Sequence, residues 1–213
     1  MAAIKGVIFD LDGVICFTDN FHYRAWKAIA DREHIYFDEK INNRLRGVSR
    51  MESLDIILEK AERIYSGEEK ERLAEEKNEI YKGLLSEMSR EDLSSAVKST
   101  LYGLRGKGYL LAVGSSSKNT KQILERIGLG DFFDAVSDGT NIARSKPDPE
   151  VFIKAAQMLG LEPEECVVVE DAEAGIRAAH DGGFVSAGIG EAARSPLTDH
   201  PLGTIRELME WLL

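Results

Sequence analysis

Residues 7–14 read Val7-Ile8-Phe9-Asp10-Leu11-Asp12-Gly13-Val14. The apolar residues before Asp10 predict a strand buried in a sheet, and Gly13 lets the chain turn directly after it. Residues two apart on an extended chain point the same way, so the carboxylates of Asp10 and Asp12 can face one small volume. Two such acids suit chemistry in which one attacks or holds a metal while the other moves a proton. A strand that simply ends in a polar turn is the alternative interpretation.

Helical and strand-like segments alternate from about residue 94 onward. Helices are predicted over 95–107, 119–127, 149–159, 172–181 and about 204–212, and strands over 109–113, 135–136, 166–169 and 184–185. Such alternation is typical of a parallel sheet with helices on both faces. Open sheets of this kind place their functional sites at the carboxyl ends of the strands.

The pattern between Val14 and about Met88 is helical instead. Ser49-x-x-Glu52 and Ser66-x-x-Glu69 are capping boxes that would begin two of these helices. The sequence therefore predicts an α/β fold, with a doubly wound, Rossmann-like parallel-sheet core split by an inserted all-helical cap subdomain. We expect the core to cover 1–16 and 89–213, and the cap to cover 17–88.

Composition excludes several classes of function. The 213 residues carry a net charge of −10, which gives no basic footprint for nucleic acid and disfavours anionic membranes. No apolar stretch has the length of a membrane span, and the one after Met1 runs directly into Asp10, so it is a poor signal peptide. Cys16 and Cys166 are the two cysteines, and they fit buried thiols in a reducing compartment. We therefore expect a cytoplasmic protein.

Two polar clusters follow later strands and suit a phosphate group. Strand 109–113 runs into Gly114-Ser115-Ser116-Ser117-Lys118-Asn119, where hydroxyls, backbone amides and an ammonium group meet the start of a helix. Lys146 lies between Ser145 and Pro147, and a lysine held beside carboxylates would bind phosphate and offset their repulsion. A serine-rich helix cap and a surface helix start are the alternatives.

A third cluster is acidic. Strand 166–169 runs into Glu170 and Asp171, which near Asp10 would supply hard oxygen ligands. Oxygen ligands favour Mg²⁺ over zinc, since the chain offers no suitable set of cysteines and histidines.

The order Asp-x-Asp, Ser-Ser, Lys-Pro and Glu-Asp, each after a strand of one α/β core, resembles the haloacid dehalogenase superfamily over nearly the whole chain. The resemblance implies that Asp10 is a nucleophile that forms an aspartyl-phosphate and that Asp12 is the general acid and base. Ser115 and Lys146 would hold the phosphoryl group. Mg²⁺ would be bound by the acids of the motif set: Asp10, Asp12, Glu170 and Asp171.

The helical segments narrow the resemblance. Residues 18–26, Leu45-Arg46-Gly47-Val48-Ser49-Arg50 and Lys77-Asn78 look like the β-phosphoglucomutase family, whose helical cap covers the active site. By this resemblance Arg50 holds the phosphate that is not being transferred, and His22 aligns Asp12 with the reacting hydroxyl. The expected substrate- and phosphate-binding residues are His22, Gly47, Val48, Ser49, Arg50, Lys77, Ser115, Ser116, Ser117, Lys118, Asn119 and Lys146.

Three features depart from that family. Phe17 stands where an aspartate is usual, and Ser94-Ser95 replaces the usual Pro-Gly at the start of the second core helix. The segment after Gly190 is short and differs as well.

The resemblance implies an isomerase that interconverts β-glucose 1-phosphate and glucose 6-phosphate through an aspartyl-phosphate and a bisphosphate. It further implies Mg²⁺ as cofactor, a small sugar phosphate as substrate and a monomeric protein that binds neither nucleic acid nor membranes. A Mg²⁺-dependent sugar phosphatase of the same superfamily is the main alternative. A non-catalytic sugar-phosphate sensor is a third alternative, against which the intact set of Asp10, Asp12, Lys146 and Asp171 argues.

Overall fold

A computed structural model of the chain describes residues 3–46 and 48–212. Within these residues, six strands form one parallel sheet in the order β3-β2-β1-β4-β5-β6. The strands are β1 (Gly6–Phe9), β2 (Leu110–Gly114), β3 (Ala135–Ser137), β4 (Cys166–Glu170), β5 (Val185–Ile189) and β6 (His200–Leu202). The central strand β1 is paired on both sides, with Gly6 opposite Leu110 and Cys166. The predicted α/β class is confirmed.

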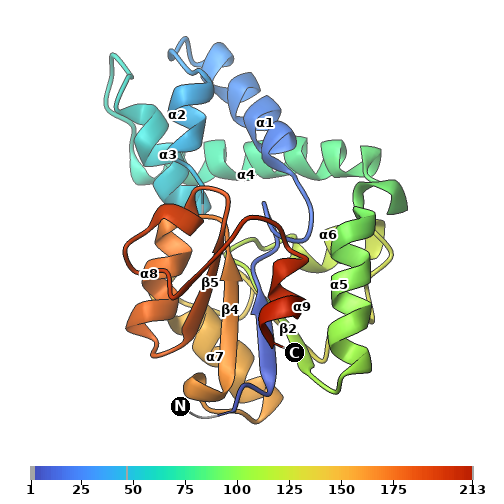
Figure 1. Cartoon of the computed structure of the whole chain (residues 1–213). Coiled ribbons are helices and arrows are strands. Elements are labelled where there is room, and N and C mark those ends of the chain that lie inside the picture. Colours follow the sequence, from blue (N-terminus) through green and yellow to red (C-terminus); the bar gives the residue numbers. More distant parts are fainter. Residues whose placement is uncertain (1–2, 47, 213) are drawn as a thin grey trace.

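Helices cover both faces of the sheet (Figure 1). The helices of the core are α5 (Ser95–Gly106), α6 (Thr120–Arg126), α7 (Glu150–Leu159), α8 (Glu173–Asp181) and α9 (Glu207–Leu212). Residues of α5, α6 and α9 share one hydrophobic cluster with one face of the sheet, while α7 and α8 pack on the other. This is the doubly wound arrangement that the alternation of helices and strands predicts.

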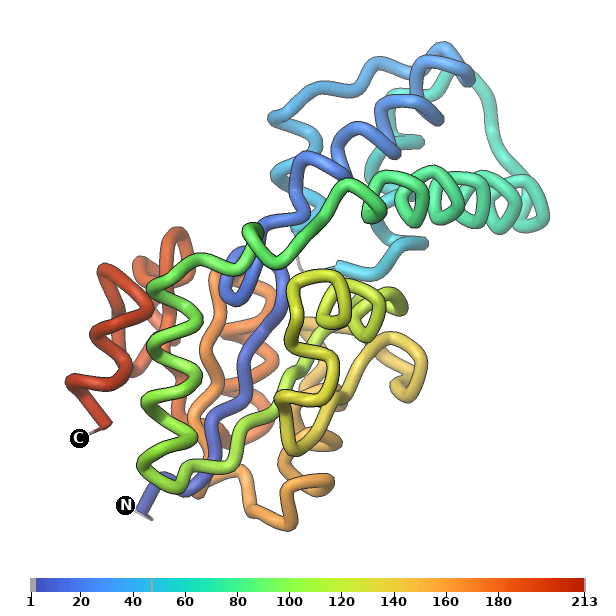
Figure 2. The backbone as a smooth tube through the Cα atoms, turned by 90° about the vertical axis from the view of Figure 1, so that its right-hand side faces the viewer, coloured from blue at the N-terminus to red at the C-terminus, as the bar shows by residue number. Residues whose placement is uncertain are grey.

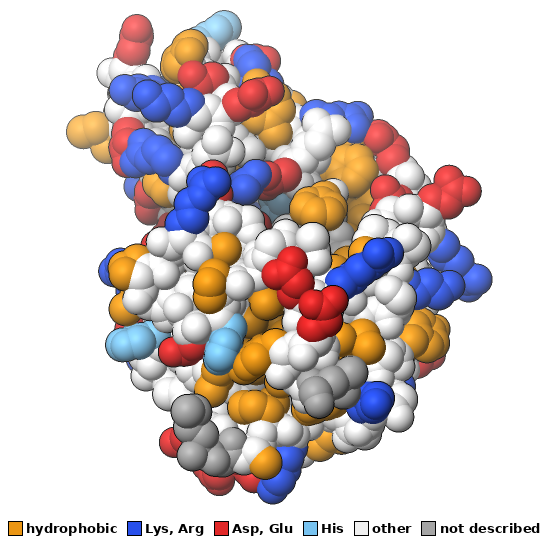
Figure 3. All heavy atoms as spheres, in the orientation of Figure 1, with side chains coloured by type: hydrophobic (Ala, Val, Ile, Leu, Met, Phe, Trp, Pro, Cys, Tyr) orange, Lys and Arg blue, Asp and Glu red, His pale blue; other side chains and the backbone are white. Residues whose placement is uncertain are grey.

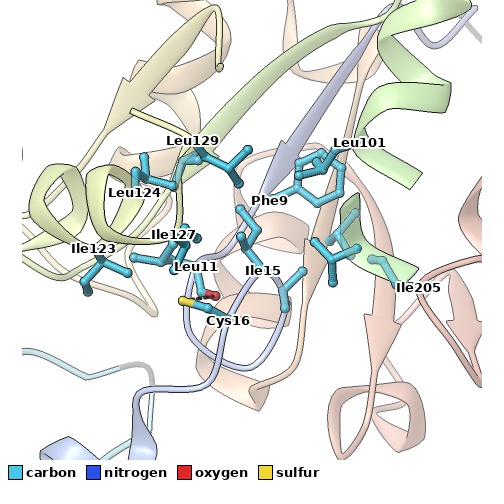
Figure 4. Close-up of a cluster of buried hydrophobic side chains, with 14 of the residues drawn as sticks. Phe9, Leu11, Ile15, Cys16, Leu101, Ile123, Leu124, Ile127, Leu129 and Ile205 are labelled. Atoms are coloured by element: carbon cyan, nitrogen blue, oxygen red, sulfur yellow. Dashed lines mark hydrogen bonds between the residues drawn. The ribbon is translucent and has the colours of Figure 1, made fainter. Parts of the chain in front are cut away.

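The hydrophobic cluster shared by α5, α6 and α9 holds the turn that follows β1. Phe9 from β1 and Leu11 and Ile15 from the following turn pack with Leu101 of α5 and Leu124 of α6 (Figure 4). The turn after β1 is therefore anchored in the core on both sides of Asp10. Close packing of this kind holds a backbone in one position.

The segment between β1 and α5 forms α1 (Asp19–Arg32), α2 (Glu39–Asn43), α3 (Arg50–Leu58) and α4 (Gly67–Leu84). These inserted helices lie over the carboxyl ends of the strands (Figure 2). They bury a hydrophobic cluster of their own, centred on Trp26, Ile29, Leu54 and Leu73. Both predicted capping boxes are present, since Ser49 caps α3 and Ser66 caps α4.

The structure differs from the sequence-based expectation mainly at the far edge of the sheet. Strand β5 continues to Ile189, and β6 was not predicted, because an edge strand of three residues that contains Pro201 has little strand character. Helix α5 begins normally without Pro-Gly, since the Ser94 hydroxyl accepts a hydrogen bond from the Val97 amide at 3.2 Å.

Two further expectations can be compared with the structure. Cys16 and Cys166 are both buried and free. Among the described helices, not one combines the length and the apolar character that crossing a membrane requires.

Candidate active site

The predicted site residues converge on one pocket of about 560 Å³ between the sheet and the inserted helices. Asp10 follows β1, Ser115 follows β2, Lys146 precedes α7, and Glu170 ends β4. The carboxyl ends of parallel strands meet at one edge of the sheet, which brings these side chains together. A hollow at this level is visible on the surface, with both basic and hydrophobic side chains at its rim (Figure 3).

One side of the pocket, here called the acidic wall, consists of Asp10, Glu170, Asp171 and the lysine between them. The Lys146 ammonium is 1% exposed and forms ion pairs with Asp10 and, at 2.5 Å, with Glu170. Burial alone would lower the pKa of Lys146, but the two carboxylates outweigh burial and raise it. Lys146 is therefore a permanent positive charge beside the acids, as a phosphate-binding lysine must be.

The three acids of this wall are close enough to share a cation. Oxygen atoms of Asp10, Glu170 and Asp171 lie within 4.8 Å of one another. Burial and the charge of Glu170 raise the pKa of Asp171 to about 7, although Lys146 and Arg46 oppose them. A divalent cation would offset both the burial of this carboxylate and its repulsion by Glu170. The donor set is compatible with a metal ion.

Two glycines make room for these acids. A Cβ atom on Gly175 would lie 1.9 Å from Glu170 Oε1, and one on Gly13 would lie 2.0 Å from Asp171 Oδ2. Glu170 Oε2 also accepts hydrogen bonds from the backbone amides of Asp171 and Ala172, each at 2.9 Å. The side chain of Glu170 is thus fixed by its contacts and by the shape of α8.

Asp12 has different surroundings from the other acids. The Thr18 hydroxyl donates a hydrogen bond to Asp12 Oδ1, and His22 Nε2 lies 4.0 Å from Oδ2. Burial raises the pKa of Asp12 to about 6, against the opposing effect of the Thr18 hydrogen bond. A carboxyl with a pKa near neutrality suits proton transfer. The Asp12 carboxylate is not among the acids clustered for a metal in the described chain, so its predicted part in metal binding stays a prediction.

The opposite side of the pocket, here called the basic wall, consists of His22, Arg50 and Lys77 from the inserted helices, together with Asn78, which is hydrogen-bonded to Arg50. Lys77 is buried against the rings of Trp26 and Tyr81, and its Nζ lies 2.8 Å from His22 Nδ1. Burial and the charge of Arg50 lower the pKa of Lys77 to about 7. Burial, Lys77 and Arg50 likewise lower the pKa of His22 well below its usual value. When Lys77 donates to Nδ1, the neutral ring carries its hydrogen on Nε2, toward Asp12.

Arg50 is joined to the core through Asn78. Arg50 Nη2 donates to Asn78 Oδ1 at 2.8 Å, and Asn119 Nδ2 donates to the same oxygen at 3.0 Å. Arg50 Nη1 also pairs with Glu75 at 3.3 Å. Cationic and amide donors from α3 and from the loop before α6 therefore meet around one acceptor, as they would around a phosphate oxygen.

The serine loop is held in place by its own hydroxyls. Ser115 Oγ accepts from the Ser117 amide, and Ser117 Oγ accepts from the Asn119 amide, each at 3.2 Å. Ser116 Oγ accepts a hydrogen bond from the Lys146 amide at 3.4 Å, which links this loop to the lysine of the acidic wall. Lys118 lines the same pocket and is exposed.

The remaining predicted residues have simpler positions. Val48 and Ser49 line the pocket, but the Ser49 hydroxyl is engaged as the cap of α3. Gly47 lies outside the described residues.

Sequence reasoning missed Arg46 and Met51, which line the pocket, and also Thr18 and Asn78, which do not line it but form hydrogen bonds with Asp12 and Arg50. Thr18 and Asn78 lie in the stretches that resemble the β-phosphoglucomutase family, which is the signal that could have identified them. Phe17, noted as a departure from that family, lines the pocket as well.

Comparison with known proteins agrees with this geometry. Residues 4–183 match the haloacid dehalogenase-like hydrolase family. The chain is 43% identical over 190 residues to the β-phosphoglucomutase of Bacillus subtilis, an alignment that covers 88% of this chain and 84% of that protein. It is 31% identical over 184 residues to a phosphorylated carbohydrates phosphatase of Thermotoga maritima, covering 85% and 82% of the two chains.

A solved structure gives the same result for the fold. The crystal structure of β-phosphoglucomutase from Clostridium difficile superposes with a TM-score of 0.91 and 37% sequence identity, covering 98% of this chain and 95% of that one. The family match, over residues 4–183, includes the strand ends that form the acidic wall. The chain belongs to the haloacid dehalogenase-like hydrolase family.

Proposed function

We propose that this chain is a Mg²⁺-dependent β-phosphoglucomutase that interconverts β-glucose 1-phosphate and glucose 6-phosphate. One observation supports a mutase in particular: a single pocket offers two separate places for phosphate. Lys146 and Ser115 lie beside Asp10, while Arg50 and Asn119 meet on the opposite wall. A mutase must hold both phosphates of a bisphosphate at once. The 43% identity to a β-phosphoglucomutase supports the same reaction.

In the proposed mechanism Asp10 carries the phosphoryl group and Asp12 moves the proton. A sugar hydroxyl gives its proton to Asp12 while its oxygen attacks the phosphorus on Asp10, and the bond from phosphorus to the Asp10 carboxylate breaks. The bisphosphate then turns over, and its other phosphate returns to Asp10 while Asp12 protonates the leaving oxygen. A carboxyl with a pKa of about 6 can serve in both directions.

The other residues of the two walls stabilise the charges of this transfer. Lys146 and Ser115 would hold the phosphoryl oxygens, and His22 would orient Asp12 and the reacting hydroxyl. Asp10, Glu170 and Asp171 would hold Mg²⁺, with Asp12 as a further predicted ligand. The cation would supply neutralisation of phosphoryl charge. We expect excess EDTA to remove activity and the larger Ca²⁺ to inhibit it.

We further propose that residues 17–88 act as a cap whose closure excludes water. Water would otherwise attack the aspartyl-phosphate and turn the mutase into a phosphatase. A sugar phosphatase is therefore the second candidate, favoured by the 31% identity to a carbohydrate phosphatase.

The decisive experiment follows both fates of the phosphoryl group. Purified protein with Mg²⁺ and a catalytic amount of glucose 1,6-bisphosphate is given β-glucose 1-phosphate, and glucose 6-phosphate and inorganic phosphate are measured together. A mutase forms glucose 6-phosphate far faster than inorganic phosphate, whereas a phosphatase releases inorganic phosphate. Sugar 1-phosphates derived from maltose and trehalose cleavage would be compared in the same assay. A protein that neither turns over a phosphoester nor is phosphorylated by acetyl phosphate would be a sensor.

A further inference from the structure

Two of the apolar side chains that line the pocket are exposed to solvent, whereas Trp26 and Leu45, which also line it, are buried. Phe17 lies in the segment that leads into α1 and is 71% exposed. Met51 lies in the first turn of α3 and is 38% exposed. Apolar area left open beside polar groups is typical of a surface that a ligand covers.

The backbone that carries the exposed Phe17 ring is held in place. Its neighbours Cys16 and Thr18 are both fully buried, and Thr18 is bound to Asp12. The backbone is therefore fixed on both sides of Phe17. A flat ring on a fixed backbone binds with little loss of conformational freedom, and the flexible side chain of Met51 can adapt to its ligand.

The chemistry of the pocket leaves one part of the proposed substrate for these two side chains. The phosphates have their own places, at Lys146 and at Arg50. Between two phosphates a hexose bisphosphate carries a six-membered ring, whose faces present C–H bonds that pack well on aromatic and thioether groups. An acyclic phosphoester has no such face.

We propose that Phe17 and Met51 bind the C–H face of a pyranose ring and thereby select pyranose phosphates over acyclic phosphoesters. This inference rests on the proposed function of the same pocket. It gives Phe17 a role in substrate selection at a position where the related family usually has a charged residue.

Phe17→Ala and Met51→Ala test the proposal, with Ile64→Ala as the matched control. Ile64 is 95% exposed and does not line the pocket. For each pocket variant we expect KM for β-glucose 1-phosphate to rise about three- to tenfold. Phosphorylation by acetyl phosphate, which has no ring, should change much less, so the ratio of the two kcat/KM values falls. Phe17→Trp, which keeps a flat ring, should have a KM for β-glucose 1-phosphate close to that of the wild type.

Several outcomes would overturn the proposal. An equal loss with both phosphate donors would mean that Phe17 and Met51 support the pocket rather than contact the sugar, and an unchanged KM would remove them from recognition. If the wild-type protein turned over no hexose phosphate, the proposed function would fail instead. Calorimetric titration of glucose 6-phosphate into wild type and Phe17→Ala would then still decide the ring contact, since equal affinities contradict it.

Discussion

The two walls of the pocket are built in different ways. The acidic wall grows from the ends of β1 and β4 and the loop before α7, and parallel pairing fixes β1 against β4 residue by residue. The basic wall comes from α1, α3 and α4, whose positions depend on a separate hydrophobic cluster. Under the proposed function, the sheet holds the groups that make and break the phosphorus–oxygen bond, while the inserted helices determine whether a sugar hydroxyl or water reaches it.

The largest expected effect separates two acids that follow the same strand. Asp10→Asn should remove all turnover, because the nucleophile is lost. Asp12→Asn should still bind phosphate, but its rate of turnover should fall roughly 10²–10⁴-fold, which is the usual contribution of a general acid and base. Mass spectrometry after treatment with acetyl phosphate should place the phosphoryl group on Asp10 in the wild type. A phosphoryl group on another residue would contradict both assignments.

Arg50→Ala tests the basic wall, again through reaction rates. Loss of a charged hydrogen-bonding group should lower mutase activity roughly 10- to 100-fold, while formation and hydrolysis of the aspartyl-phosphate persist. The ratio of glucose 6-phosphate to inorganic phosphate gives the measurement. Arg44→Ala is the control, since Arg44 pairs with Glu59 outside this pocket. An unchanged ratio in Arg50→Ala would favour the phosphatase.

Gly175→Ala tests the acidic wall through the position of Glu170. The added Cβ must displace Glu170, and we expect metal affinity to fall about tenfold with the loss of one well-placed ligand. Calorimetric titration with Mg²⁺ measures this effect without relying on turnover. Gly83→Ala is the matched helical control, because a Cβ there meets nothing within 4 Å. Equal metal affinity in the two variants would show that Glu170 is not a ligand.

The smallest expected effect is the contribution of Lys77, in the basic wall, to the pH dependence of the free energy of unfolding. Lys77 has a pKa of about 7 when folded, against about 10.4 for an unfolded lysine, so the unfolded chain binds more protons between these values. The free energy of unfolding should therefore rise with pH through this window, by at most about 2.5 kcal/mol from pH 7 to 9. Below pH 7 the full cost of burying the charge is present.

Lys77→Met should remove this part of the pH dependence. Urea unfolding at pH 7 and pH 9 measures this dependence, and Lys82→Met, at a partly exposed position of the same helix, is the control. The groups that face Lys77 are His22, Arg50 and Asp12, together with two aromatic rings. If the free energy of unfolding changed equally with pH in Lys77→Met and in the wild type, Lys77 would stay charged in the folded protein.

The acidic wall could be predicted from the sequence because its information is local. Asp10, Lys146 and Glu170 each sit directly beside a recognisable strand or helix start, and parallel topology brings such positions together. The capping boxes at Ser49 and Ser66 could be predicted for the same reason, since each involves residues three apart.

The contacts of the basic wall could not be read in the same way. His22 meets Lys77 across 55 positions, and Asn78 meets Asn119 across 41, so no short pattern records either contact. Resemblance to a family suggested His22 and Arg50, but not that Asn78 would join Arg50 to the core. The space that Gly175 leaves for Glu170 is likewise a property of three-dimensional packing.

The position of β1 in the middle of the sheet has a consequence for how the protein is made. Gly6 pairs with Leu110 on one side and with Cys166 on the other, so β1 is synthesised before either of its partner strands. Such non-local pairing folds slowly and leaves an apolar strand unpaired in the meantime. The inserted helices, which bury a cluster of their own, contain the local contacts that form early. The strand that leads into Asp10 is therefore synthesised before both of its partners and paired only after them.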